Sequence, residues 1–185
     1  SEADEIIKEA KKLADDHHRL NKEIIERNKR LSEENHKLNE KIIEDVRRLV
    51  KDVAERLKRD EDRRDLDRLV DEVREELRRL LEESERSTED VKRESKRLLD
   101  ESKKSAEDVK RDLDRLLKEV EEKVRDKEKL DRLREKVEEI KRRVDKSNDE
   151  LRRSMEESNK RNDESTDRLR EELRRLDEEL DRRRK

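Results

Sequence analysis

The sequence contains no glycine, proline, cysteine, tryptophan, tyrosine or phenylalanine. Without cysteine the chain has neither a disulfide framework nor thiolate chemistry, and without glycine it has no phosphate-binding loop. Average proteins carry about 7% glycine and about 5% proline, so the loss of both removes the residues that most often break helices. The residues that remain, chiefly Glu, Lys, Arg and Leu, favour helix throughout the chain.

Charged residues occupy 62% of the 185 positions, with 56 Lys and Arg against 59 Asp and Glu. The two signs are interleaved, whereas a nucleic-acid binder gathers its basic residues on one face, so we expect no nucleic-acid partner. No apolar run approaches the roughly 18 residues that span a bilayer, and no signal-peptide pattern opens the chain. We therefore expect a soluble chain with no membrane partner and no targeting segment, and its localisation is unknown.

Apolar residues make up only 25% of the chain, which alone would indicate disorder, but they recur at a fixed interval of 18. The rows include Ile6, Ile24 and Ile42; Leu80, Leu98 and Leu116; and Leu133, Leu151 and Leu169. Eighteen residues are about five turns at 3.6 residues per turn, so this repeat imposes no supercoil, unlike a heptad. The pattern predicts nearly straight helices that lie side by side.

The apolar pattern lapses between Leu57 and Leu66 and again between Val124 and Leu130. We interpret each lapse as a turn, with Asp60 or Asp62 and then Asp126 as caps of the following helices. The sequence thus predicts one domain, residues 1–185, with helices at about 2–58, 62–125 and 128–184. Because short connections make neighbouring helices antiparallel, the expected fold is all-α, an elongated up-down-up antiparallel three-helix bundle. The alternative is one unbroken helix of roughly 280 Å.

Near the middle of each predicted helix, polar residues occupy positions at which the repeat is otherwise apolar. We expect them to form a buried polar network, and they are His17, Asn21, Asn28, Ser32, Asn35, Asn39, Ser84, Ser87, Thr88, Ser95, Ser102, Ser105, Ser147, Asn148, Ser154, Ser158, Asn162, Ser165 and Thr166.

Folding the chain at the two lapses aligns these residues. Position i of the first helix then faces about 122 − i of the second, and position j of the second faces about 254 − j of the third. In the first pairing Asn28 meets Ser95, His17 meets Ser105, Asn21 meets Ser102, Asn35 meets Ser87 and Thr88, and Asn39 meets Ser84. In the second pairing Ser95 meets Ser158, Ser105 meets Asn148 and Thr88 meets Thr166.

A buried amide or hydroxyl without a partner costs roughly 1–3 kcal/mol, so matched layers penalise wrong registers more than they add stability. With its absent glycine, proline and aromatics, its 18-residue rows and its Asn, Ser and His layers, the whole chain resembles computationally designed parametric helical bundles with buried hydrogen-bond networks. The resemblance implies a scaffold or an interaction module without a natural substrate.

The sequence has three histidines, the residue type that most often serves as a metal ligand or general base. His17 falls in the seam, whereas His18 and His36 share a row about 90° from its centre. No two of them are spaced i, i+4, and no Cys accompanies them, so we expect no metal, no cofactor and no enzymatic activity. If His17 is buried and neutral, its protonation would make the protein less stable as the pH falls.

The apolar stripes of the first two helices are wider, at roughly 140° and 120°, than that of the third at roughly 80°. Outer members of these stripes, namely Ile7, Ile25, Ile43, Leu80 and Leu98, are therefore expected to remain partly exposed. This asymmetry leaves two alternatives open. Either the chain requires no partner, or it self-associates or recruits a partner helix along the first two helices.

Overall fold

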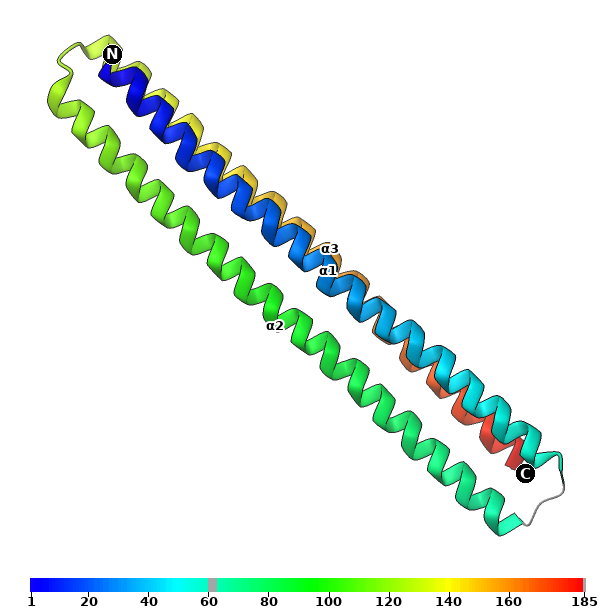
Figure 1. Cartoon of the computed structure of the whole chain (residues 1–185). Coiled ribbons are helices and arrows are strands. Elements are labelled where there is room, and N and C mark those ends of the chain that lie inside the picture. The colour runs from blue at the N-terminus through cyan, green and yellow to red at the C-terminus, as the bar shows by residue number, and fades with distance from the viewer. Residues whose placement is uncertain (60–62, 185) are drawn as a thin grey trace. The chain divides into compact units, whose positions relative to one another are not determined.

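The computed structural model describes residues 1–59 and 63–184, with the side chain of Arg184 excepted. These residues form three helices, α1 (Glu2–Leu57), α2 (Arg63–Lys123) and α3 (Lys127–Arg184) (Figure 1). The described part of the chain contains no strand. The fold is a three-helix bundle, and the alternative of one unbroken helix is wrong.

Helix boundaries follow local capping. At the start of α1, the backbone N–H of Asp4 donates to Ser1 Oγ at 3.4 Å, and Ser1 Oγ donates to Asp4 at 3.0 Å. At the start of α3, the N–H of Glu128 donates to Oδ1 of Asp126 at 3.1 Å, which confirms Asp126 as an N-cap. The other two predicted caps, Asp60 and Asp62, lie outside the described residues.

The described residues fall into two compact units, and each unit takes a stretch from every helix. Unit 1 comprises residues 1–28 and 94–157, and unit 2 comprises residues 29–93 and 158–185. Within unit 1, α1 and α2 are antiparallel, because His17 contacts Ser105 while the later Asn28 contacts the earlier Ser95. Within unit 2, α1 and α3 are parallel, because the contact of Ser32 with Asn162 precedes that of Arg47 with Glu172 along both helices.

Apolar clusters form the core of each unit. In unit 1 one cluster contains Ala10, Ala14, Ala106, Val109, Leu113, Val137, Ile140 and Val144, and a second contains Ile24, Leu98, Leu151 and Met155. In unit 2 a cluster contains Ile42, Val46, Val50, Val53, Val70, Val73, Leu77, Leu169, Leu173, Leu176 and Leu180. Each fully buried aliphatic side chain contributes roughly 1.5–3 kcal/mol, so these clusters supply the driving force for folding.

Among the five apolar residues expected to be partly exposed, Ile7, Ile25, Ile43 and Leu80 are indeed half-buried. Leu98 is the correction, because it is only 2% exposed and packs in a cluster with Ile24, Leu151 and Met155. Its neighbour Leu99 is the half-buried member of that Leu-Leu pair. No large apolar side chain is fully exposed in the described part of the chain.

Candidate functional site

The candidate site consists of the polar layers between the apolar clusters. In unit 1, His17 is 2% exposed, with Nδ1 2.9 Å from Ser105 Oγ and Nε2 2.7 Å from Asn148 Oδ1. An amide oxygen only accepts hydrogen bonds, so Nε2 carries the proton and Nδ1 accepts the hydroxyl proton of Ser105. Both nitrogens of the neutral ring are thereby satisfied. The predicted contact between Ser105 and Asn148 is therefore bridged by His17.

Asn21 connects the three helices of unit 1. Its Oδ1 accepts from Ser102 of α2 at 2.5 Å, and its Nδ2 donates to two α3 residues, Ser147 at 2.8 Å and Asn148 at 3.0 Å. The 3.3 Å approach of Nδ2 to Nε2 of His17 adds little, because both atoms carry protons. Three of the four hydrogen-bonding positions of this 1% exposed amide are thus used.

His18 was not expected in the network, yet its Nδ1 lies 2.9 Å from Ser147 Oγ. Because Ser147 already accepts a hydrogen bond from Asn21, its own hydroxyl proton is free to be donated to His18. His18 is exposed, so its ring covers the layer from the flank of α1.

The same arrangement recurs in unit 2, moved by 18 residues. Ser84 donates to Asn39 Oδ1 at 2.5 Å, and Asn39 Nδ2 donates to Ser165 at 3.0 Å. Ser165 Oγ lies 3.2 Å from Nδ1 of His36, and Nε2 of His36 lies 2.9 Å from a carboxylate oxygen of Glu40. A carboxylate only accepts hydrogen bonds, so Nε2 of His36 donates to Glu40. Nδ1 of His36 then accepts from the hydroxyl of Ser165.

The position of His17 is taken in unit 2 by Asn35, which is 18 residues later. Its Oδ1 accepts from Ser87 at 2.9 Å, and Thr88 lies at the longer distance of 3.4 Å. Thr88 also contacts Thr166 at 2.7 Å and the carbonyl of Ser84 at 3.0 Å. The two units thus share the hydrogen bonds of Asn21 and Asn39, and they differ in the neighbouring layer, which contains His17 in unit 1 and Asn35 in unit 2.

Two further pairs lie beside these layers, namely Asn28 with Ser95 at 2.5 Å in unit 1 and Ser32 with Asn162 at 2.7 Å in unit 2. All observed α1–α2 pairs lie within one residue of the register that the sequence predicts.

Some predicted residues and atoms are left outside these bonds. Ser158 is buried and Ser154 half-buried, and neither takes part in the hydrogen bonds described above. The predicted pair Ser95 and Ser158 would join the two units and stays a prediction. Among the described residues, the Nδ2 atoms of Asn28, Asn35 and Asn162 and Oδ1 of Asn159 are buried without a hydrogen-bond partner.

Ion pairs flank the polar layers. In unit 1 the pKa of Glu94 is lowered, first by a hydrogen bond from Arg97 and then by the charges of Arg97 and Arg27. In unit 2 the pKa of Lys92 on α2 is raised, chiefly by its hydrogen bond to Asp163 on α3, 2.7 Å away. Such exposed pairs contribute about 0–1 kcal/mol each, so they support pairing only weakly.

The series Ser165, His36, Glu40 has the hydroxyl–imidazole–carboxylate order of a catalytic triad. Ser165 is only 9% exposed, however, and its oxygen is occupied by Asn39, so the geometry gives a substrate carbonyl no approach. In the part of the chain that the structure describes, no three His, Cys, Asp or Glu residues gather to hold a metal ion. None of the described helices is long and apolar enough to cross a membrane.

Fold and site together define a three-helix bundle with buried Asn, Ser, Thr and His layers. A solved structure described as "Computationally designed three helix bundle" is similar, with a TM-score of 0.65 and 16% sequence identity. The alignment covers 98% of this chain and 88% of that chain, and at this identity the likeness concerns the fold. No family model matches the sequence, and no curated protein matches it.

Proposed function

We propose that this chain is a designed, non-enzymatic scaffold whose polar layers specify how its helices pair. The observation that carries the proposal is the duplicated set of hydrogen bonds, in which Asn21 and Asn39 each join a serine of α2 to a serine of α3. The similar fold described as computationally designed supports the artificial origin, as do the helix-favouring composition and the 18-residue repeat.

The specificity argument depends on what a shift in register would do. A shift of α2 by one turn, for example by four residues, would place Asn21 opposite Leu98 and Asn28 opposite Val91, which leaves their amides without partners at roughly 1–3 kcal/mol per group. An 18-residue shift, by contrast, would still bring Asn21 opposite Ser84 or, in the other direction, Asn39 opposite Ser102. Such a shift is penalised at the other layers, for example at Asn28, which would exchange Ser95 for Leu77 or Leu113.

The experiment replaces the unit 2 layer with apolar residues by combining Asn39→Leu, Ser84→Ala and Ser165→Ala. We expect an equal or higher free energy of unfolding, because replacing the buried partners of a polar set together is often neutral or stabilising, and His36 keeps its contact with Glu40. Spin labels on cysteines introduced at the exposed positions Lys37 and Arg86 of unit 2 then report the α1–α2 register.

The parent chain should give one narrow distance between the labels, and the apolar variant should give several. A matched pair of labels at Arg19 and Lys104, both exposed in unit 1, should keep one narrow distance in both proteins. If the apolar variant keeps a single narrow distance in unit 2 as well, the layer does not specify register.

A second candidate function is that of an interaction module. The half-buried Ile43 and Leu80 of unit 2 support it, because partly exposed apolar residues in rows favour contact with another helix. In that case a second copy or a partner helix would lie along α1 and α2. Light scattering tests self-association, since a mass of 22.8 kDa at all concentrations would contradict it and a defined multiple would support it.

A further inference from the structure

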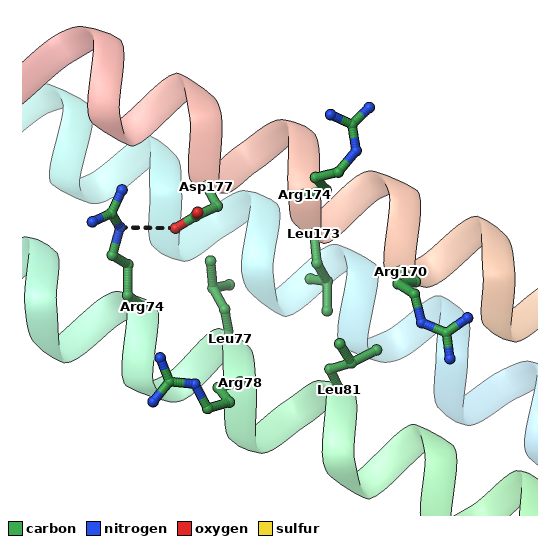
Figure 2. Close-up of a pocket in the computed structure, with 8 residues that line it drawn as sticks. All are labelled: Arg74, Leu77, Arg78, Leu81, Arg170, Leu173, Arg174 and Asp177. Carbon is green, nitrogen blue, oxygen red and sulfur yellow. Dashed lines mark hydrogen bonds and ion pairs between the residues drawn. The ribbon is translucent and has the colours of Figure 1, made fainter.

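The surface groove between α2 and α3 of unit 2 has matched charges (Figure 2). Arg74 donates to Asp177 at 2.8 Å, and each of the other three arginines that line the groove also has a carboxylate partner. Leu77 and Leu173 point toward the opposite helix and are only 6% and 4% exposed. The groove therefore offers neither a free charge nor open apolar surface. Polar atoms without a partner are found instead in the core of this unit.

Two buried amide groups of unit 2 have donors without an acceptor. Nδ2 of Asn35 on α1 and Nδ2 of Asn162 on α3 are buried without a hydrogen-bond partner, and the two residues are 1% and 2% exposed. Each amide is anchored by its oxygen, since Asn35 accepts from Ser87 and Asn162 accepts from Ser32. A buried donor that makes no hydrogen bond is destabilising. The two nitrogens are therefore the groups in this layer that need an acceptor.

The register of α1 and α3 places these two nitrogens at the same level. Contacts between the polar residues of α1 and α3 in unit 2 join positions that are 126 to 130 apart in the sequence. Asn35 and Asn162 are 127 apart. In unit 1, Asn21 and Asn148 have the same separation and are joined directly, from Nδ2 to Oδ1, at 3.0 Å. In unit 2 both residues present a nitrogen, so the same spacing brings two donors together.

Unit 1 shows how the equivalent layer is closed there. The counterpart of Asn35 is His17, whose Nε2 reaches across to Asn148 on α3 at 2.7 Å. The counterpart of Asn148 in unit 2 is Thr166. The amide of Asn35 is shorter than an imidazole ring, and its nitrogen makes no hydrogen bond to Thr166. A small group between them would make the connection that the ring makes in unit 1.

The hydroxyl of Thr166 has acceptor capacity for such a group. Oγ1 of Thr88 lies 3.0 Å from the backbone carbonyl of Ser84, which only accepts, so the single hydroxyl proton of Thr88 is used there. The 2.7 Å contact between the two threonines then uses the proton of Thr166. The oxygen of Thr166, which is 5% exposed, is left to accept a hydrogen bond.

We propose that this layer binds one buried water molecule, which accepts from Nδ2 of Asn35 and of Asn162 and donates to Oγ1 of Thr166. A buried water typically makes about three hydrogen bonds to groups that otherwise lack partners, and these three atoms supply them. An anion would accept from the same two amides, but it would lose its hydration among uncharged side chains, which is far more costly. The site does not depend on whether the layers specify register.

The first test detects water at the amide protons of the isotope-labelled full chain by NMR. A long-lived bound water gives cross-peaks of opposite sign in laboratory-frame and rotating-frame Overhauser spectra, whereas chemical exchange gives the same sign in both. We expect cross-peaks of opposite sign for the side-chain amides of Asn35 and Asn162. Asn39 is the matched control, because it also contacts two serine hydroxyls but its Nδ2 already donates to Ser165. Any signal that exchanging hydroxyls relay to Asn39 sets the background.

The second test copies the unit 1 layer into unit 2. Each substitution introduces the residue that stands 18 positions away in unit 1, and the variant combines Ser32→Ala, Asn35→His, Thr88→Ala, Asn162→Val and Thr166→Asn. Oxygen-17 relaxation dispersion measures the number of long-lived internal waters. We expect one fewer in the variant than in the parent chain, with the helix content unchanged. The first test needs no variant, so it decides the proposal even if this variant does not fold.

The proposal is overturned if Asn35 and Asn162 give no more water signal than Asn39. That result is expected if the amide of Asn162 is turned over, so that its oxygen accepts directly from Asn35. A folded variant with as many long-lived waters as the parent chain would also overturn it. So would a saturable shift of both amide signals during titration with sodium bromide, because an anion would then occupy the site.

Discussion

Nε2 of the buried His17 lies 2.7 Å from Oδ1 of Asn148. This contact fixes the ring in the form protonated at Nε2, so that Nδ1 accepts from Ser105, 2.9 Å away. The three side chains that contact the ring, Ser105, Asn148 and Asn21, are all uncharged. The layer is therefore complete when His17 is neutral, and it offers no carboxylate to a protonated ring.

This geometry predicts that the ring of His17 stabilises its layer. His17→Leu leaves the hydroxyl of Ser105 without its acceptor in a site where His17 is 2% exposed, and we expect a loss of roughly 1–3 kcal/mol in the free energy of unfolding. Urea unfolding of the parent chain and the variant measures the change, and equal stability of the two would contradict the prediction.

Removal of a single asparagine should be costly where removal of a whole layer is not. Asn39→Leu leaves the hydroxyl of Ser84 without its acceptor, whereas Ser165 keeps its contact with His36. We expect a loss of roughly 1–3 kcal/mol in the free energy of unfolding. Urea unfolding followed by far-ultraviolet circular dichroism measures the change. The equivalent change in unit 1, Asn21→Leu, should cost at least as much, because Asn148 also loses a donor. Parent-like stability of both variants would show that the hydroxyls find other partners.

The N-cap of α3 makes an independent contribution. Asp126→Ala removes the acceptor for the N–H of Glu128, and we expect a loss of about 0.5–2 kcal/mol in the free energy of unfolding. Asp131→Ala, an exposed substitution within the same helix, is the matched control and should be close to neutral. An Asp126 variant as stable as the Asp131 variant would mean that water replaces the cap.

Glu94 should make the stability of the fold depend on pH. The hydrogen bond from Arg97 lowers the pKa of Glu94 below its ordinary value of 4.5. A lowered pKa stabilises the fold above that value, and the contribution is lost as the pH falls below it. Because the carboxylate is 27% exposed, we expect less than about 1 kcal/mol.

The Glu94→Gln variant should therefore unfold with a flatter pH dependence below about pH 4.5 than the parent chain. Glu101→Gln is the comparison, since its carboxylate lies 4.0 Å from Arg97 and no hydrogen bond joins them. If both variants change the pH dependence of unfolding below about pH 4.5 equally, the hydrogen bond from Arg97 to Glu94 does not contribute to it.

Sequence periodicity predicts the three helices and the α1–α2 register, because an 18-residue step and two lapses leave few ways to align Asn28 with a polar partner such as Ser95. It does not predict the environment of His18 and His36, since a position about 90° from the stripe centre looks solvated. The imidazole is long enough to reach inward from that flank. The available signal was the pair His18 and Asn21, which recurs as His36 and Asn39.

Detailed pairing was also beyond the sequence. Asn148 bonds to Ser102 at 3.1 Å and to His17, whereas register alone places it at Ser105. Which hydroxyl turns toward which amide depends on side-chain rotamers and on the exact rotation of each helix. Leu98 shows the same limit, because a small rotation moves it from the edge of the stripe into an apolar cluster with Met155.

The duplication of the Asn21 layer at Asn39 also makes the chain extensible. An 18-residue block inserted into each helix at the same level would add five turns, about 27 Å of helix. A repeat of the Asn39 layer in the inserted block would bring its own serine partners on both neighbouring helices. His17 occurs in one block and not in the other. Such a residue would then determine which blocks pair, because its hydrogen-bond partners are present at one level only.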